Sequence, residues 1–315
     1  MSTPIIETRG LKKYFEVPKG LLHAVDDVSL TINHNETLGV VGESGCGKST
    51  LGRVIMRLID STEGEILYDG KDITKLSGLR KKQMYKDMQM IFQDPYTSLN
   101  PRLSISDIIA EPMKVCKTVR GKNAIKKRVS ELMDEVGLAQ RYFNAYPHEL
   151  DGGRRQRVGI ARALALDPKF IVFDEPVSAL DVSIQAQILN LIMDLQERKG
   201  LAYMFITHDL CVVKHISTNI MVMYMGNVVE YTSKEKLFEK QWHPYSQALL
   251  SAIPLTELNA NRERIILEGE VSSPVNPGKG CRFAPRCKYA SKKCYEDIPL
   301  VEVEEGRKVA CTLYT

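Results

Sequence analysis

A glycine-rich run near the N-terminus has the spacing of a phosphate-binding loop. It fits the pattern Gly-x4-Gly-Lys-Ser/Thr, follows the apolar run Leu38–Val41 and precedes an apolar helical pattern. Backbone N–H groups of such a loop surround a β-phosphate, Lys48 supplies positive charge to the β- and γ-phosphates, and Ser49 offers its hydroxyl to Mg²⁺. We therefore expect the chain to bind ATP or GTP. The predicted nucleotide-binding residues here are Gly42, Glu43, Ser44, Gly45, Cys46, Gly47, Lys48, Ser49 and Thr50.

Two adjacent carboxylates follow a second apolar run, Phe170–Phe173. A buried strand of this kind delivers Asp174 and Glu175 to the carboxyl edge of a sheet, where ligands bind. We predict that Asp174 reaches the Mg²⁺ shell and that Glu175 orients or deprotonates the attacking water. The alternative is a strand that ends in a charged turn. The chain has no Asn-Lys-x-Asp sequence that would read guanine, which favours ATP over GTP.

Four of the seven cysteines lie within the last 35 residues, among several lysines and arginines. Four thiolates suit an iron–sulfur cluster or zinc, and free thiols are the third alternative. The spacing lacks the Cys-x2-Cys knuckle of structural zinc. The nearby lysines and arginines would offset the net negative charge of a thiolate-bound cluster. We expect Cys116 and Cys211, in helical stretches, to be small buried apolar residues. The predicted metal ligands are Cys281, Cys287, Cys294 and Cys311.

Composition excludes several classes of protein. The 315 residues are 43% hydrophobic and 26% charged, with a net charge of only +4, so nucleic acid is not an expected partner. No apolar run approaches the ~18 residues that a membrane helix needs. The N-terminus lacks the pattern of a secretory signal, and we expect a cytosolic location.

The pattern of apolar residues predicts an α/β chain with a mixed sheet and a helical insert. We predict a core over residues 1–101 and 151–243, a helical subdomain over 102–150, and a Cys-rich C-terminal appendage over 244–315. A helix is expected over Gln185–Lys199. The predicted strands are Ile5–Thr8, Ala24–Ile32, Thr37–Val41, Gly64–Tyr68, Met88–Phe92, Phe170–Phe173 and Tyr203–Thr207.

The run that begins Leu150-Asp-Gly-Gly-Arg-Arg-Gln-Arg, placed between the two phosphate motifs, resembles the signature of ABC transporter nucleotide-binding subunits. The likeness covers about residues 5–250 and implies a P-loop ABC ATPase core in which two subunits enclose two ATP molecules. By this resemblance Tyr14 stacks on adenine, and His208 contacts the γ-phosphate. The resemblance also makes Gln93 a ligand of Mg²⁺ that senses the γ-phosphate. The residues implied to contact the partner's nucleotide are Asp151, Gly152 and Gly153.

Three further stretches, Phe92–Arg102, Trp242–Leu250 and the cysteine tail, resemble the oligopeptide and dipeptide permeases. The second (F-type) ATPase subunit of those systems is the closest in pattern. The resemblance implies ATP-driven peptide import, a 4Fe–4S cluster in the tail, and a peripheral position on the cytoplasmic face of the membrane. It also implies a second homologous ATPase subunit, two integral membrane permease subunits and, indirectly, an extracellular binding protein as partners. Tyr96 and Leu99 are then expected in the groove that meets the permease.

Three alternative functions stay open at this point, and one of them is a binding module without turnover, which the intact Glu175 opposes. A nickel importer shares the architecture, because an ATPase subunit does not touch the cargo. A soluble ABC ATPase that acts on nucleic acid or ribosomes uses the same chemistry, but such proteins usually carry two cassettes or long basic insertions, and this chain has neither.

The signature departs from the usual Leu-Ser-Gly-Gly-Gln, since Asp151 replaces the serine and Arg154 the glutamine. An ionised carboxylate accepts hydrogen bonds but cannot donate one, and it repels phosphate unless Arg154 or Mg²⁺ offsets its charge. We therefore predict a heterodimer with unequal sites, in which the site that uses Asp151 turns over slowly. The rival prediction is that Asp151 points away and that both sites work.

Overall fold

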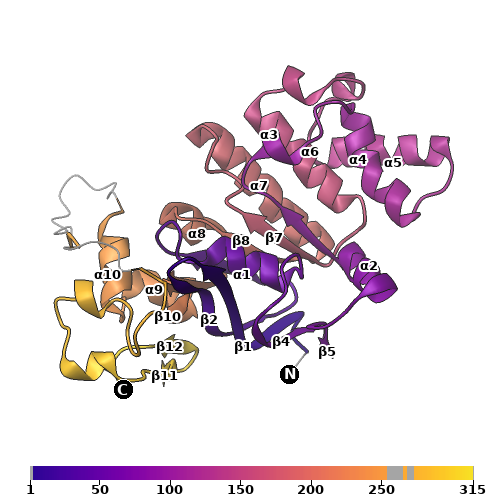
Figure 1. Cartoon of the computed structure of the whole chain (residues 1–315). Coiled ribbons are helices and arrows are strands. Elements are labelled where there is room, and N and C mark those ends of the chain that lie inside the picture. The colour runs from indigo at the N-terminus through magenta and orange to yellow at the C-terminus, as the bar shows by residue number, and fades with distance from the viewer. Residues whose placement is uncertain (1–2, 254–264, 268–272, 315) are drawn as a thin grey trace. The chain divides into compact units, whose positions relative to one another are not determined.

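The computed structural model describes residues 3–253, 265–267 and 273–314 (Figure 1). The chain divides into two compact units. The first unit joins both ends of the chain, Met1–Thr74 and Phe205–Thr315, and the second is Lys75–Met204. The strand β8 (Ala202–Ile206) runs across this division.

An antiparallel sheet of four strands opens the first unit, in the order β2-β1-β4-β5. The long β1–β2 hairpin dominates it and places Tyr14 directly opposite His23. The pairing shifts register on both sides of Lys13, so the hairpin is irregular near Tyr14. The strands are β1 (Ile6–Val17), β2 (Gly20–Ile32), β4 (Glu63–Tyr68) and β5 (Lys71–Asp72).

A second set of strands in the first unit is mixed, in the order β3-β9-β10-β12-β11. β3 (Thr37–Val41) is buried at all five residues and lies parallel to β9, as expected of a continuous apolar run. β9, β10, β12 and β11 then pair antiparallel. The bounds are β9 (Asn219–Tyr224), β10 (Asn227–Ser233), β11 (Val301–Glu304) and β12 (Arg307–Val309).

The helices of the first unit begin at recognisable caps. Lys48 is the first residue of α1, after Gly47 in a left-handed conformation. Asp209 caps α8, and His243 caps α10 by accepting a hydrogen bond from the Tyr245 N–H at 3.1 Å. The helices are α1 (Lys48–Ile55), α8 (Leu210–Ile216), α9 (Lys234–Glu239), α10 (Pro244–Ser251) and the 3-10 turns η3 (Ala284–Arg286) and η4 (Lys292–Tyr295).

The C-terminal segment contributes to the core of the first unit. Phe283 is buried against Tyr224 of β9 and Tyr245 of α10, with ring centroids 5.3 and 5.4 Å away. Val309 of β12 pairs with Glu230 of β10. The segment that the sequence presented as a poorly periodic appendage thus supplies both strands and core side chains.

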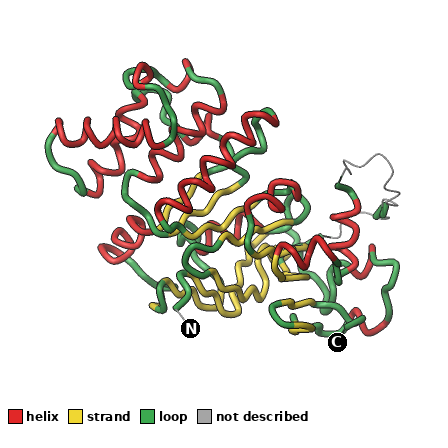
Figure 2. The backbone as a smooth tube through the Cα atoms, turned by 180° about the vertical axis from the view of Figure 1, so that it is seen from behind, coloured by secondary structure: helices red, strands yellow, loops and turns green. Residues whose placement is uncertain are grey.

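The second unit contains β6, β7, the first three residues of β8 and most of the long helices (Figures 1 and 2). β6 lies parallel to β7, and α4, α5 and α6 pack against one another. The predicted helical stretch contains α4 and α5, whereas the domain boundaries themselves stay a prediction. The elements are α2 (Gly78–Asp87), β6 (Met88–Ile91), α3 (Pro95–Ser98), α4 (Ile105–Cys116), α5 (Lys122–Glu135), η1 (Gln140–Tyr142), η2 (Pro147–Glu149), α6 (Gly152–Leu164), β7 (Phe170–Asp174) and α7 (Val182–Lys199).

The α/β class and the mixed sheet are confirmed. Each of the seven predicted strands overlaps an observed one, and the expected helix over Gln185–Lys199 begins three residues earlier, at Val182. In the part of the chain that the structure describes, no helix combines the length and the apolar character needed to cross a bilayer.

Candidate nucleotide site

The phosphate-binding loop leaves the end of β3 and closes at the start of α1. The Lys48 ammonium turns back into the loop and donates hydrogen bonds to the carbonyl oxygens of Gly42 and Glu43, at 2.8 and 2.9 Å. Lys48 is only 4% exposed. The positive charge is therefore held inside the loop, on the side where the backbone can enclose a phosphate.

Two glycines of the loop pattern are required by close backbone contacts. Gly42 and Gly47 have φ values of +153° and +103°. A Cβ at Gly47 would lie 2.0 Å from the carbonyl oxygen of Ala24, and one at Gly42 would lie 2.2 Å from that of Met223. No L-residue side chain fits at either position, so the glycine pattern follows from how the loop packs.

Tyr14, predicted to stack on adenine, stands in the β1–β2 hairpin of the same unit. Its ring is stacked on the His23 ring, with centroids 3.9 Å apart, and its hydroxyl donates a hydrogen bond to Asp26. Burial raises the pKa of Tyr14, and the hydrogen bond to Asp26 raises it further. The hydroxyl is thus fixed as a donor, and His23 occupies one face of the Tyr14 ring.

His208 lies two residues after the end of β8 and is exposed. The preceding residue, Thr207, donates its N–H to the carbonyl oxygen of Val40 at 3.2 Å. Val40 lies on β3, two residues before Gly42. The structure thus ties the backbone next to His208 to the strand that carries the phosphate loop.

In the second unit, β7 delivers the two predicted carboxylates. Asp174 is fully buried, and Glu175 follows it with a φ of +48°, which is unusual for a residue with a side chain. The Gln93 amide donates a hydrogen bond to the Glu175 carboxylate at 3.0 Å. These residues meet because β6 and β7 run parallel, with Ile91 beside Phe173, and end at the same edge. Their catalytic roles stay predictions.

Asp151 is the N-cap of α6. One carboxylate oxygen accepts a hydrogen bond from the Arg154 N–H at 2.8 Å, and the other pairs with the Arg154 guanidinium. The charge of Asp151 is therefore offset locally by the residue that replaces the usual glutamine. Gly152 and Gly153 open the helix, and a Cβ at Gly153 would lie 2.6 Å from the Ile184 side chain.

Two side-chain predictions were wrong. Leu99, expected at the permease surface, is 2% exposed and belongs to the core, because it is the apolar residue that closes α3. Tyr96 is 65% exposed, and the Arg155 guanidinium lies 3.7 Å from the centre of its ring. Cys211, expected to be buried, is exposed, because it lies on the outer face of α8, whereas Cys116 is partly buried.

The four C-terminal cysteines lie within electrostatic reach of one another. Burial, together with the nearby thiols of Cys311, Cys287 and Cys294, raises the pKa of Cys281 to about 11. Burial also raises the pKa of Cys287 and Cys311. Among the described residues, however, no three Cys, His, Asp or Glu side chains are placed so as to hold a metal ion. The four thiols are thus near one another, but they are not arranged to coordinate a metal ion.

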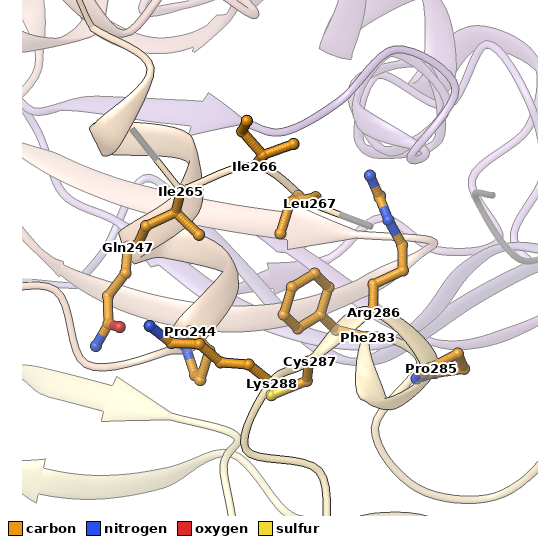
Figure 3. Close-up of a pocket in the computed structure, with 10 residues that line it drawn as sticks. All are labelled: Pro244, Gln247, Ile265, Ile266, Leu267, Phe283, Pro285, Arg286, Cys287 and Lys288. Atoms are coloured by element: carbon orange, nitrogen blue, oxygen red, sulfur yellow. The ribbon is translucent and has the colours of Figure 1, made fainter. Parts of the chain in front are cut away.

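A cavity of about 560 Å³ borders this cysteine segment (Figure 3). Its lining is mostly apolar and includes Phe283, Leu267 and Cys287. A neighbouring cavity shares Leu267 and Arg286 and reaches Glu43 of the phosphate loop. The sequence offers Arg286 only as one of several positive charges near the cysteines, whereas the structure pairs it with Glu43 at 3.1 Å.

Two family models match the chain. The ABC transporter model matches residues 25–178, and the model for the C-terminal region of oligopeptide/dipeptide transporters matches residues 229–294. Similar curated proteins include a putative oligopeptide transport ATP-binding protein of Bacillus subtilis, 51% identical over 99% of this chain and 96% of its own length. A dipeptide transport ATP-binding protein of Haemophilus influenzae is 47% identical over 98% of this chain and 97% of its own.

Solved structures of ATP-binding cassettes are also similar. The dimeric cassette MJ0796, bound to ADP and phosphate, is 28% identical with a TM-score of 0.67, over 73% of this chain and 98% of that one. The cassette cbiO1 of Clostridium perfringens, part of the complex cbiONQ, is 25% identical with a TM-score of 0.67, over 76% of this chain and 92% of that one. The similarity confirms the expected ABC ATPase fold.

Proposed function

The chain belongs to the ATP-binding subunits of the ABC transporter family, and we propose that it hydrolyses ATP to energise the import of oligopeptides or dipeptides through a membrane permease. The observation that carries this proposal is the pairing of two features in one chain. One is a closed phosphate loop with Lys48 turned inward. The other is the C-terminal region that matches oligopeptide/dipeptide transporters. The names of the two curated relatives described above also point to peptides.

The residues present fit ATP with Mg²⁺. ATP supplies the phosphoryl group that is transferred to water, and Mg²⁺ neutralises charge on its phosphates. In this proposal the loop backbone and Lys48 hold the phosphates, while Tyr14 holds the base. Ser49, Gln93 and Asp174 would hold Mg²⁺.

Glu175 is the proposed base that orients the attacking water. A carboxylate aligned by a fixed donor loses little orientational freedom when water binds, and the Gln93 amide is such a donor. Gln93 therefore serves two purposes in this proposal, as a Mg²⁺ ligand and as a support for Glu175. His208, exposed beside the strand that carries the phosphate loop, is proposed to contact the γ-phosphate.

We propose that the chain works in an assembly of ATPase and membrane permease subunits. Two ATPase subunits enclose ATP, and the dimeric form of the similar cassette MJ0796 supports this arrangement. We propose that the second subunit is a different homologous chain and that both dock on two membrane permease subunits at the cytoplasmic face. A binding protein outside the cell would deliver the peptide. The exposed Tyr96, held by Arg155, is the proposed contact with the permease.

A 4Fe–4S cluster on Cys281, Cys287, Cys294 and Cys311 also stays a proposal, with zinc as its alternative. Its support is chemical, since four sulfur donors from one segment lie near one another. The described side chains do not form a coordination site. Binding would require the thiols to move together and lose their protons.

Uptake into cells tests the transport function. Cells that carry Glu175→Gln in place of the natural chain are given labelled dipeptides, longer peptides and, separately, nickel. We expect peptide uptake to fall by at least about 100-fold, because removal of a general base typically costs two to four orders of magnitude. The matched control is Glu197→Gln on the exposed surface of α7, which should leave uptake unchanged. Loss of nickel uptake with normal peptide uptake would contradict the proposed cargo.

A further inference from the structure

Two arginines that flank the first two C-terminal cysteines reach the nucleotide site from opposite ends. Arg282 follows Cys281 and Arg286 precedes Cys287. We propose that Arg282 and Arg286 are positioning residues for ATP, Arg282 fixing the base-stacking Tyr14 through Asp26 and Arg286 fixing the phosphate loop through Glu43. This inference rests on the proposed function, because it presumes that the site binds ATP.

Arg282 completes a polar cluster behind Tyr14. Its guanidinium donates to the Asp26 carboxylate and to the carbonyl oxygen of Met225. Asp26 also accepts the Tyr14 hydroxyl and lies 2.9 Å from Nδ1 of His23. The side chains of Arg282 and Asp26 are only 7% and 16% exposed, so water screens this ion pair weakly.

The pKa of Asp26 follows from this cluster. Burial alone would raise it, but hydrogen bonds from Tyr14 and His23 and the charge of Arg282 lower it below its ordinary value. Asp26 therefore stays an acceptor that orients the Tyr14 and His23 rings. Without Arg282, the half-buried Asp26 carboxylate would lose a guanidinium partner, and the orientation of Tyr14 would loosen.

Arg286 acts at the other end of the site. Its guanidinium lies 3.1 and 3.2 Å from the two carboxylate oxygens of Glu43, and 3.4 Å from the Tyr224 hydroxyl. In Figure 3 the Arg286 side chain projects away from Cys287 and Lys288. Glu43 is the residue whose carbonyl oxygen accepts from Lys48, and its N–H donates to the Tyr245 hydroxyl at 2.8 Å. Arg286 thus holds one of the two residues whose carbonyl oxygens position the Lys48 ammonium.

The backbone of the same segment supports the base-stacking hairpin. Asn276 donates its N–H to the carbonyl oxygen of Leu21, and its side chain accepts from the Leu21 N–H, both at 2.8 Å. The His23 N–H donates to the carbonyl oxygen of Pro274 at 3.0 Å. A Cβ at Gly20 would lie 2.0 Å from the Asn276 amide, so the turn is shaped around this contact. The C-terminal segment therefore holds both the hairpin and the phosphate loop.

The affinity of the purified, assembled transporter for ATP tests this inference. Arg286→Gln and Glu43→Gln should each raise the Kd for ATP about tenfold, the loss expected for one charge-assisted hydrogen bond. The double variant should raise it no further, because both substitutions break the same contact. Arg282→Gln should raise the Kd similarly, and Arg282→Lys, which keeps the charge, should recover part of the affinity. Lys293→Gln, an exposed neutralisation in the same segment, is the matched control.

Hydrolysis separates positioning from a merely structural role. The KM for ATP should rise in the Arg282 and Arg286 variants while kcat stays within about twofold, since the reacting groups are untouched. If Arg286→Gln does not fold, Glu43→Gln still removes the contact and keeps the arginine. An unchanged Kd in the folded variants, or an additive double variant, would overturn the inference. Failure of the natural protein to bind ATP would instead overturn the proposed function.

Discussion

At the scale of single residues, the least usual feature is Asp151, the acidic N-cap of α6, the helix that carries the signature sequence. A carboxylate in place of a serine places negative charge where a neighbouring subunit's phosphate is expected. Asp151 is held by the Arg154 N–H and guanidinium, so the two departures from the usual signature compensate each other. Asp151 in place of the usual serine and Arg154 in place of the usual glutamine therefore depend on each other.

We predict that Arg154→Gln lowers ATP turnover about tenfold at the site that Asp151 completes, measured in transporters whose other site is disabled by Glu175→Gln, because it leaves the charge of Asp151 unbalanced near phosphate. The free energy of unfolding should change by less than about 1 kcal/mol, since the pair is exposed. Steady-state ATPase assays and denaturant titrations check both parts. The double variant Asp151→Ser/Arg154→Gln should restore activity, and a single variant with full activity would refute the compensation.

A second prediction concerns the inequality of the two ATP sites. Glu175→Gln in this chain should abolish most ATPase activity, whereas the equivalent substitution in the partner subunit should cost less, because the partner's carboxylate serves the site completed by Asp151. The measurement is the ATPase rate of transporters that carry one substitution or the other. Equal losses would rule out unequal sites.

At the scale of secondary structure, α10 joins the nucleotide loop to the cysteine segment. His243 caps this helix with Nδ1 as the acceptor, while its own N–H donates to Glu230 at 3.0 Å and Nε2 lies 3.9 Å from the Cys281 sulfur. Burial lowers the pKa of His243 to about 3, from the 6.5 of an exposed histidine. The cap thus requires a neutral ring.

The pKa of His243 predicts acid sensitivity. Between about pH 6.5 and 3 the unfolded chain takes up a proton at His243 that the folded protein does not. The stability contributed by the neutral His243 is therefore fully present above pH 6.5. Below that pH, the free energy of unfolding falls by at most about 1.4 kcal/mol per pH unit. Denaturant titrations should show a shallower fall for His243→Asn, which keeps a cap but does not titrate. His34→Asn, at an exposed site, is the control, and identical slopes for natural protein and His243→Asn would contradict the assignment.

The elements that the sequence predicted well share one property. β3 and β7 are mostly apolar and buried throughout. A run of this kind can be recognised in the sequence without knowing which strands lie beside it. β5 has only two residues, and β11 is a short alternation of Val and Glu, so neither has a sequence pattern long enough to predict. These strands form because a neighbouring strand supplies their hydrogen bonds. The phosphate loop was predictable because its chemistry is local.

The contacts of Arg282 and Arg286 had no comparable signal. Their carboxylate partners lie 256 and 243 residues earlier in the chain, and only folding brings them together. The sequence showed basic residues near cysteines and suggested charge balance for a cluster. Long-range ion pairs of this kind depend on tertiary packing, which no local spacing encodes.

At the scale of the whole molecule, the C-terminal segment is part of the nucleotide-binding unit. It supplies Phe283 to the core and two strands to the sheet, and it contacts both the hairpin and the phosphate loop. A change in the cysteine segment can therefore reach both ends of the ATP site.

We predict that protein purified without oxygen contains about four iron and four sulfide per chain, as the stoichiometry of one cluster requires. Metal analysis and the visible absorption spectrum check this. Chelation of the iron should then raise the Kd for ATP, because a bound cluster would order the segment that carries both arginines. Replacement of Cys294 by Ala should remove the iron, whereas Cys211→Ala, at an exposed cysteine outside the segment, should not. Zinc in place of iron would support the alternative, and absence of both would contradict a metal site.

The most direct test of ATP-driven peptide import uses the purified transporter in lipid vesicles. The chain is assembled with its partner ATPase and permease subunits, the peptide-binding protein is placed on the opposite side, and ATP is supplied to the ATPase side. We expect labelled peptide to accumulate only with hydrolysable ATP, and Glu175→Gln to abolish accumulation while ATP still binds. Peptide accumulation that continues at the natural rate with Glu175→Gln, or that needs no ATP, would contradict the function assigned to this chain.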